Sequence, residues 1–287
     1  MGKVPALLKW IGNKQRFAET IIGYMPNQFG DYYEPFLGSG AVMAQLCYNS
    51  LDSFIPTFNR GYASDILPFL IDIFNIVKNE PNSIIEYYDR EITEYYSDPA
   101  TKYSEIRDRF NKNHNAYDFC LLSRTCYSGI VRFRQADGYM STPMGPHKPI
   151  SPSTFAKRVN LWNSFIGRVD FETMTFDESM DRAQQGDLVY CDPPYTHSQS
   201  IIYGSQAFSI DRLFDKIAEC KQRGVYVMLS INGSRESNRK DISVTPPEGL
   251  FERDIAINCG TSMIDRLQNA GGIMDNEVVY DRLMLTW

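Results

Sequence analysis

The spacing of apolar positions changes along the chain, and each change predicts a helix or a strand. In the first eighty residues, apolar side chains recur at helical spacing in three stretches, with short aromatic or apolar runs between them. They predict a helix over 13–24, a strand that ends at Glu34, a helix over 41–50, a strand over 61–65 and a helix over 69–78. Strands that alternate with helices in this order are typical of a parallel, doubly wound sheet.

The middle of the chain interrupts this alternation. The pattern there predicts two polar helices, over 83–96 and 102–113, then a third helix over 117–124 and a loop-rich hairpin. Strands and helices then alternate again, with strands over 168–171, 187–191 and 225–231, a helix over 209–223, and a terminal hairpin of 251–257 with 277–287. We therefore expect an α/β core that is interrupted by a mainly helical insert at 81–164.

Composition excludes several classes of protein. The chain has 287 residues, of which 43% are hydrophobic and 22% charged, so we expect a globular protein with a sizeable core. No apolar run reaches the roughly 20 residues of a membrane span, and the N-terminus lacks the apolar core of a secretory signal. The six cysteines form no C-x-x-C pair and the three histidines are separated, so we expect reduced thiols in a cytosol and no bound metal.

Charge is distributed unevenly. The whole chain has 29 Lys and Arg against 35 Asp and Glu, a net charge of -6, whereas residues 102–168 have 11 basic and 4 acidic residues. A basic block inside an acidic chain indicates a surface that binds a polyanion, and its Tyr, Phe, Ser and Asn suit contacts with phosphates and bases. A solvated helical face with chance clustering remains the alternative.

A glycine-rich turn follows the first predicted strand, in the sequence Phe36-Leu37-Gly38-Ser39-Gly40. Two glycines let the backbone turn tightly and approach a bulky ligand where a Cβ atom would clash. A dinucleotide fingerprint needs a third glycine at position 43, which is Met43 here. Asp65 ends the next predicted strand, where such folds place an acid against ribose hydroxyls. A plain tight turn and a capping aspartate remain the alternatives.

The sequence Asp192-Pro193-Pro194-Tyr195 directly follows the buried strand over 187–191. Two prolines cannot continue a sheet and donate no N–H, so they hold the chain extended with its carbonyl groups unpaired. A carboxylate beside such a carbonyl can accept both hydrogens of an exocyclic amino group, and Tyr195 offers a flat face for stacking a base. These groups suit the alkylation of an amino group on a nucleobase.

Taken together, these segments resemble one family, the Dam-type (α-group, D12 class) DNA adenine-N6 methyltransferases. The motifs that carry the resemblance, in the family's order, are Lys9-Trp10-Ile11-Gly12-Asn13-Lys14, Glu34-Pro35-Phe36-Leu37-Gly38-Ser39-Gly40, Asp65 and Val189-Tyr190-Cys191-Asp192-Pro193-Pro194-Tyr195. Residues 122–133 are similar to the family's recognition hairpin, and residues 142–149 to the segment after it. The resemblance implies a Rossmann-like class I methyltransferase sheet, formed by 1–80 and 165–287, with 81–164 as an inserted, mainly helical DNA-recognition domain.

The resemblance also implies that the cofactor is S-adenosyl-L-methionine. Trp10 and Lys14 would border its methionine end, and Asp65 would bind its ribose hydroxyls. The expected cofactor-binding residues are Trp10, Lys14, Glu34, Phe36, Gly38, Gly40, Asp65, Phe176, Asp177 and Asp192, of which Phe176 or Asp177 would touch the adenine.

The target adenine cannot be reached inside a duplex, so it must be flipped out of the helix. Tyr195 would stack on it, while the Asp192 carboxylate and the Pro193 carbonyl accept hydrogen bonds from its amine. The expected catalytic residues are therefore Asp192, Pro193, Pro194 and Tyr195, with no metal.

Contacts with DNA are expected from the insert. Arg132 is the candidate for a bidentate contact with a guanine beside the target adenine, the commonest specific contact in the major groove. Tyr127 and Ser128 would hold the gap left by the flipped base, and Ile130 would contact a neighbouring base. The expected DNA-binding residues are Arg124, Tyr127, Ser128, Ile130, Arg132, Arg134 and Lys148, with Arg134 and Lys148 on phosphates.

Three other functions stay open at this stage. An amino-group methyltransferase acting on RNA is the nearest, because the Asp-Pro-Pro-Tyr motif indicates the amine and not the polymer. A catalytically silent nucleic-acid-binding module and a nicotinamide oxidoreductase fit the motifs less well. The partners expected are double-stranded DNA and a restriction endonuclease that acts separately, for a monomer in the cytosol of a bacterium, an archaeon or a phage host.

Overall fold

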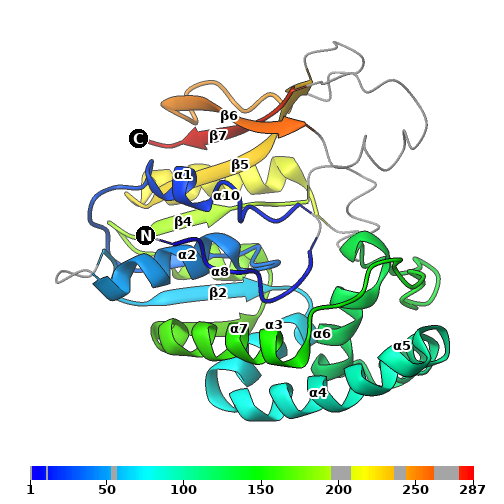
Figure 1. Cartoon of the computed structure of the whole chain (residues 1–287). Helices are drawn as coiled ribbons and strands as arrows, with labels where there is room; N and C mark the ends of the chain where they lie inside the picture. Colours follow the sequence, from blue (N-terminus) through cyan, green and yellow to red (C-terminus); the bar gives the residue numbers. More distant parts are fainter. Residues whose placement is uncertain (1, 11, 53–56, 195–207, 236–243, 262–277) are drawn as a thin grey trace.

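The computed structural model describes residues 2–10, 12–52, 57–194, 208–235, 244–261 and 278–287 (Figure 1). Its centre is a seven-stranded sheet in the order β3-β2-β1-β4-β5-β7-β6. The strands are β1 (Tyr32–Glu34), β2 (Gly61–Asp65), β3 (Val169–Thr173), β4 (Leu188–Cys191), β5 (Tyr226–Arg235), β6 (Arg253–Thr261) and β7 (Val278–Leu285). The first five pair in parallel and β7 pairs antiparallel with both neighbours, so the predicted α/β sheet with a terminal hairpin is confirmed.

Helices cover both faces of the sheet, which is why the central strands are apolar on both sides. In β4 every residue is buried, and its alternate side chains enter two different core clusters. One cluster contains side chains of α1 (Ala18–Ile22), α2 (Ala41–Asn49), α3 (Pro68–Asn79) and α7 (Pro152–Phe165). The other contains side chains of α8 (Phe176–Arg182) and α10 (Ile210–Gln222).

The order of the strands reverses direction between β1 and β4. From β1 the chain moves outward through β2 to β3, and from β4 it moves to β5 on the opposite side. In open α/β sheets, ligands bind at the carboxyl ends of the strands beside such a switch point. The fold therefore places a binding crevice where β1 and β4 end.

The insert contributes α4 (Pro81–Ser97), α5 (Pro99–Asn113) and α6 (Ala116–Thr125), as the sequence predicted. A buried polar network joins them: the Asp118 carboxylate, fully buried in α6, accepts from the Arg109 guanidinium of α5, which also bonds Glu91 of α4. Their apolar side chains belong to the same core cluster as α3 and α7. In Figure 1 the insert lies along the β2 side of the sheet.

Local structure differs from the prediction in three places. The helix predicted over 13–24 is only α1, because residues 13–17 form a turn in which the Asn13 amide donates to the Trp10 carbonyl. Helices α7 and α8 were missed. Their N-terminal signals are in the sequence: Ser151 caps α7, and Thr175 with Glu178 forms a capping box for α8. Helix α7 packs against α3 and α2 as well as against α4, and the boundary at 164 stays a prediction.

Candidate active site

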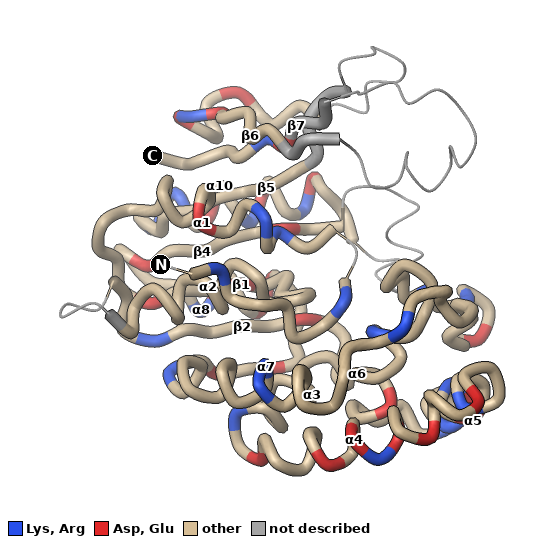
Figure 2. Tube along the Cα trace, in the orientation of Figure 1, with Lys and Arg blue, Asp and Glu red and all other residues tan. Residues whose placement is uncertain are grey.

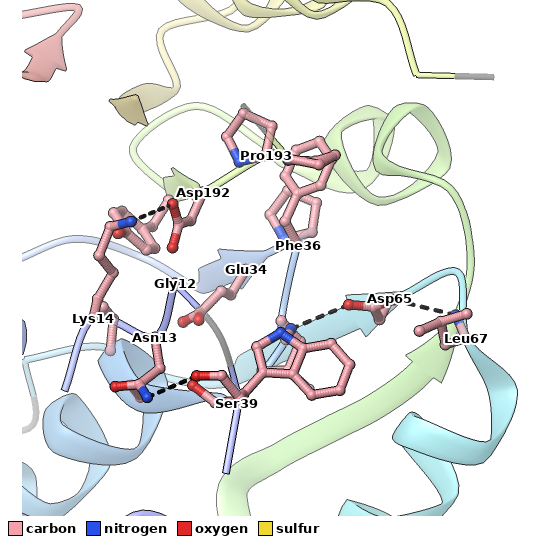
Figure 3. Close-up of a pocket in the computed structure, with 18 of the residues that line it drawn as sticks. Gly12, Asn13, Lys14, Glu34, Phe36, Ser39, Asp65, Leu67, Asp192 and Pro193 are labelled. Carbon is pink, nitrogen blue, oxygen red and sulfur yellow. Dashed lines mark hydrogen bonds and ion pairs between the residues drawn. The ribbon is translucent and has the colours of Figure 1, made fainter. Parts of the chain in front are cut away.

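An open cavity lies at the predicted switch point (Figure 3), and its empty space is about 860 Å³ when the open solvent at its mouth is included. It is lined by residues that follow β1, β2 and β4 and by the N-terminal segment before α1. Nine residues predicted from the sequence line it together, namely Trp10, Lys14, Glu34, Phe36, Gly38, Asp65, Asp192, Pro193 and Pro194. Motifs more than 180 positions apart in the chain thus meet at one cavity. Tyr195 lies outside the described residues.

The two glycines after β1 have different surroundings. Gly38 lines the cavity with a φ of +48°, and a Cβ atom there would lie 3.1 Å from the indole nitrogen of Trp10. Gly40 does not line the cavity; it precedes α2 with a φ of +64°, and a Cβ atom would press on Leu37 and Met43 at 3.3 Å. Gly38 therefore permits the close approach of Trp10, whereas Gly40 permits the turn into the helix.

Asp65 is held by the backbone at the end of β2. One carboxylate oxygen accepts from the Gly38 N–H at 3.1 Å, and the other from the Leu67 N–H at 3.2 Å. Burial raises the pKa of Asp65 to about 6, although these N–H donors oppose the rise. The carboxylate is thus ionised near neutral pH and fixed in orientation toward the cavity that it lines.

Asp192 directly follows β4 and pairs with a buried lysine. The Lys14 ammonium lies 2.9 Å from one Asp192 oxygen and 3.6 Å from an Asp281 oxygen of β7. Burial lowers the pKa of Lys14, but the two carboxylates outweigh burial and raise it overall, so the lysine stays charged. Figure 3 shows the pair at the wall of the cavity, beside Pro193.

Glu34, the last residue of β1, is almost fully buried at the cavity wall. The Tyr32 hydroxyl donates to its carboxylate at 2.7 Å. Burial raises the pKa of Glu34 to about 8, opposed by this hydrogen bond and assisted by the nearby Asp192 charge. At neutral pH the carboxyl group is mostly protonated and can donate a hydrogen bond as well as accept one.

Phe176 and Asp177 do not line the cavity. Phe176 stacks on Phe36, which does line it, with the ring centroids 5.4 Å apart. The Asp177 carboxylate accepts from the Arg212 guanidinium at 2.8 Å. Their contact with a cofactor stays a prediction. Cavity residues that sequence reasoning missed are Gly12, Asn13, Pro35, Leu37, Ser39, Ala41, Val42, Ile66, Leu67 and Tyr190, most of them next to a predicted one.

Residues 126–145 form the recognition segment, an irregular antiparallel hairpin. Its two strands pair through isolated antiparallel β-bridges, one between Cys126 and Met144 and one between Phe133 and Met140. The Thr142 hydroxyl donates to the Ile130 carbonyl at 2.8 Å and accepts from the Arg132 N–H at 2.9 Å, so one buried side chain ties both arms. The Arg132 side chain is exposed, while its backbone N–H is held by the Thr142 hydroxyl.

The predicted DNA-contacting cations differ in their partners within the chain. Arg134 pairs with Asp137 at 2.6 Å and lies over the Tyr139 ring, and Lys148 lies 4.3 Å above the Tyr96 ring. Arg124 donates to the carbonyl of Leu7 in the N-terminal segment. Tyr127 is 40% exposed and Ser128 has a φ of +55°, so both stand at the tight turn after α6. The DNA contacts of all these residues stay predictions.

The N-terminal segment connects the recognition segment to the cavity. Its backbone carbonyls at 5, 6 and 7 accept from Trp162, Arg158 and Arg124 of the helices α7 and α6. At Gly129 a Cβ atom would lie 2.9 Å from the Lys9 carbonyl oxygen, so the recognition segment packs closely on Lys9. Trp10, the next residue, lines the cavity. The recognition segment and the cavity are therefore connected through two adjacent residues, Lys9 and Trp10.

Part of the positive charge of the insert is paired with acidic side chains of the insert itself. Figure 2 shows Asp and Glu beside Lys and Arg along α4 and α5. Lys102 pairs with Glu91 at 3.2 Å, and Arg109 pairs with Asp118 and Glu91, so these two cations stabilise the helices. Arg132 of the recognition segment, in contrast, has its side chain exposed.

Among the helices in the described ranges, none has the length and apolar character needed to cross a membrane. No three His, Cys, Asp or Glu side chains in those ranges lie together in a way that could hold a metal ion.

The sheet order and the cavity define a Rossmann-like methyltransferase fold. Residues 10–252 match the family described as D12 class N6 adenine-specific DNA methyltransferase. The chain belongs to this family, and it is an enzyme that methylates adenine in DNA. The resemblance noted in the sequence is thereby confirmed, and the RNA alternative is not supported.

Individual relatives cover most of the chain. A DNA adenine methylase of Vibrio cholerae serotype O1 is 29% identical over 253 residues, which are 83% of this chain and 85% of the relative. A DNA adenine methylase of Escherichia coli K12 is 32% identical over 206 residues, 68% of this chain and 66% of the relative. A type II methyltransferase, M1.LlaDCHI of Lactococcus lactis subsp. cremoris, is 26% identical and covers 82% of this chain and 84% of its own length.

Proposed function

We propose that this enzyme transfers a methyl group from S-adenosyl-L-methionine to the N6 amine of an adenine flipped out of duplex DNA. The observation that carries the proposal is that one cavity is lined both by Asp65 with Gly38 and by Asp192 with its prolines. The first pair suits a nucleoside with free ribose hydroxyls, and the second suits an amine that must be held by acceptors.

The residues of the cavity fit S-adenosyl-L-methionine. Gly38 lets the Trp10 indole approach the backbone closely at the cavity wall, and the Asp65 carboxylate, which lines the same cavity, is ionised and held by backbone N–H groups. The indole of Trp10 and the Phe36 side chain add apolar and aromatic surface. When bound, the cofactor supplies a methyl group on a positively charged sulfur, which the acidic wall of the cavity favours.

Asp192 and Pro193 hold the target amine. The Asp192 carboxylate and the Pro193 carbonyl each accept one N–H, which favours a more tetrahedral nitrogen whose lone pair points toward the methyl group. Bound S-adenosyl-L-methionine would supply the methyl group and leave as a neutral thioether, and the amine nitrogen would afterwards release one proton to water. No strong base is needed, because the amine becomes acidic only after transfer, so positioning and electrostatics supply most of the rate. Tyr195 stacks on the flipped base.

The insert at 81–164 recognises the DNA. Arg132 contacts a guanine edge, Ile130 contacts a neighbouring base, and Tyr127 with Ser128 fills the gap in the duplex. Lys148 and Arg134 contact phosphates, which position the enzyme without specifying sequence. Arg124, which binds the Leu7 carbonyl, acts by holding the N-terminal segment beside this surface. The protein works as a cytosolic monomer, with any partner restriction endonuclease acting separately.

The purified protein tests this proposal when it is incubated with methyl-labelled S-adenosyl-L-methionine and either duplex DNA or ribosomal RNA. We expect label only in the DNA, recovered as N6-methyladenine. Sequencing of plasmid from an expressing host, with modified-base detection, should then show one short site with a guanine beside the adenine. Label in RNA, label on cytosine, or methylation without any sequence preference would each contradict the proposal.

A further inference from the structure

We propose that Asp281, on the antiparallel strand β7, is a positioning residue for methyl transfer. Acting through Lys14, it sets the orientation of the Asp192 carboxylate and keeps the group of three charges negative beside the target amine. The inference rests on the proposed role of Asp192, and it adds a residue from the C-terminal hairpin, which none of the sequence motifs contains.

The register of the sheet brings Asp281 to the same face as Asp192. Alternate residues of a strand point to one face. Leu283 and Leu285 of β7 belong to the core cluster that also contains Tyr190 of β4. Asp281 is two residues before Leu283 and Asp192 is two residues after Tyr190, so both acids continue this apolar face toward the same edge.

Lys14 lies against both acids. Its ammonium is 2.9 Å from Asp192 and 3.6 Å from Asp281, and the three side chains are 6%, 17% and 13% exposed. A lysine ammonium has three donors, so it can serve two carboxylates at once. Buried charges are tolerated only when they are compensated, and here two negative charges share one positive charge. The group therefore has a net charge of -1.

This net charge matters for the reaction. While the nitrogen–carbon bond forms, positive charge develops on the amine nitrogen, and a negative group fixed beside it lowers the energy of that state. Without the Asp281 charge, the charges of Lys14 and Asp192 in this group sum to zero. The ammonium is then also attracted to Asp192 alone, which leaves the carboxylate less free to accept from the amine. Both effects slow the chemical step, and neither acts on the cofactor's ribose end.

Single-turnover methyl transfer with the variant Asp281→Asn tests the inference. We expect the rate of transfer to fall about tenfold, with the dissociation constants of cofactor and DNA changed less than about twofold. Asp281→Glu, which restores the charge, should recover most of the rate. Asp254→Asn is the matched control: it removes an exposed carboxylate of the neighbouring strand β6, 3.2 Å from Arg282, and should leave the rate unchanged. Should Asp281→Asn not fold, Asp281→Ser carries the same expectation.

A double-mutant cycle with Lys14→Met shows whether Asp281 acts through the lysine. If it does, the fold-loss caused by Asp281→Asn is smaller in the Lys14→Met background, where only the direct effect of its charge on the amine remains, than in the wild-type background. Equal fold-losses in both backgrounds, or a full wild-type rate for folded Asp281→Asn, would overturn the inference. An active Asp192→Asn variant would instead overturn the proposed role of Asp192, so the two failures are distinguishable.

Discussion

The cavity and the recognition segment hold their charged groups in opposite ways. In the cavity, Lys14, Asp192 and Asp65 are largely buried and held by ion pairs or backbone N–H groups, with the two acids at the ends of β4 and β2 and Lys14 in the segment before α1. In the recognition segment, Arg132 and Arg134 are exposed on an irregular hairpin that backbone hydrogen bonds and Thr142 hold in shape. If the proposed roles hold, the chemistry that needs fixed geometry is built on the sheet, and the contacts with DNA are built on the hairpin of the recognition segment.

The two regions are nonetheless in contact through the adjacent residues Lys9 and Trp10. Lys9 packs against Gly129 of the recognition segment, and Trp10 packs against Gly38 at the cavity. Substitutions can therefore be sorted by region. Those in the cavity should change the rate of transfer, and those in the recognition segment should change the choice of DNA. Those at the contacts of Lys9 and Trp10 should change both.

Removal of the Asp192 carboxylate should have the largest effect and should leave DNA recognition intact. We expect Asp192→Ala to slow single-turnover methyl transfer by about 10²–10³-fold or more, because the amine loses its main acceptor in the transition state. Radiolabelled methyl incorporation measures the rate, and a gel-shift titration measures affinity for the duplex. Transfer at the wild-type rate would remove Asp192 from the chemistry, and loss of folding in circular dichroism would make Asp192→Asn the variant to measure.

Variants of Arg132 and Lys148 should separate the recognition of a base from contact with phosphates. Arg132→Ala should lose about 1–3 kcal/mol of discrimination at one base pair, because a bidentate contact with guanine disappears. Lys148→Ala should weaken binding to all sequences alike and reduce the salt dependence by about one counterion. Competition between cognate and singly substituted duplexes measures both. If the two variants behave identically on cognate and scrambled DNA, the division between these roles is wrong.

The sequence predicted most of the sheet because its strands are short, apolar and bounded by turn residues. The strand over 61–65 was predicted with its observed ends, and 187–191 was read as buried on both faces, as β4 is. Helix α7 was missed because its polar positions follow a long loop-rich stretch, although Ser151 before Pro152 is a capping signal. Residues 13–17 were wrongly read as helical, because the ion pair of Lys14 with Asp192 and the local hydrogen bond from the Asn13 amide to the Trp10 carbonyl outweigh apolar periodicity there.

The cavity was predictable to the extent that its residues lie in motifs. Gly38, Asp65 and Asp192 follow predicted strands, and the parallel order of those strands implies that they meet. Asp281 was not found, because its partner Lys14 is more than 260 positions away and only the tertiary fold brings them together. The tail does carry a weaker signal, since Asp281 occupies the same alternation as the apolar Leu283 and Leu285.

A substitution at Gly129 tests whether the recognition segment packs tightly against Lys9. Gly129→Ala adds a Cβ atom 2.8 Å from the Lys9 side chain at a φ of +68°, so it has both backbone strain and a clash. Gly138→Ala is the control, because its φ is +67° and nothing lies within 4 Å of the added atom. We expect about 1 kcal/mol of destabilisation for the control and about 2 kcal/mol for Gly129→Ala in thermal unfolding. Only Gly129→Ala should also weaken cofactor binding; equal losses would mean that the two regions are not in firm contact.

The smallest expected effect is a pH dependence that belongs to the cavity alone. Burial raises the pKa of Asp65 to about 6, and the ribose hydroxyls need its ionised form as an acceptor. Cofactor affinity should therefore be full above this pKa and fall as the pH drops through it, with about a fourfold loss at pH 5.5 relative to pH 7. Isothermal titration calorimetry with cofactor alone measures this, and Asp65→Asn should bind more weakly at every pH without the inflection. If the inflection persists in Asp65→Asn, the titration belongs to another group. Titration of Glu34, whose pKa is near 8, would instead change cofactor affinity on the alkaline side of neutral pH.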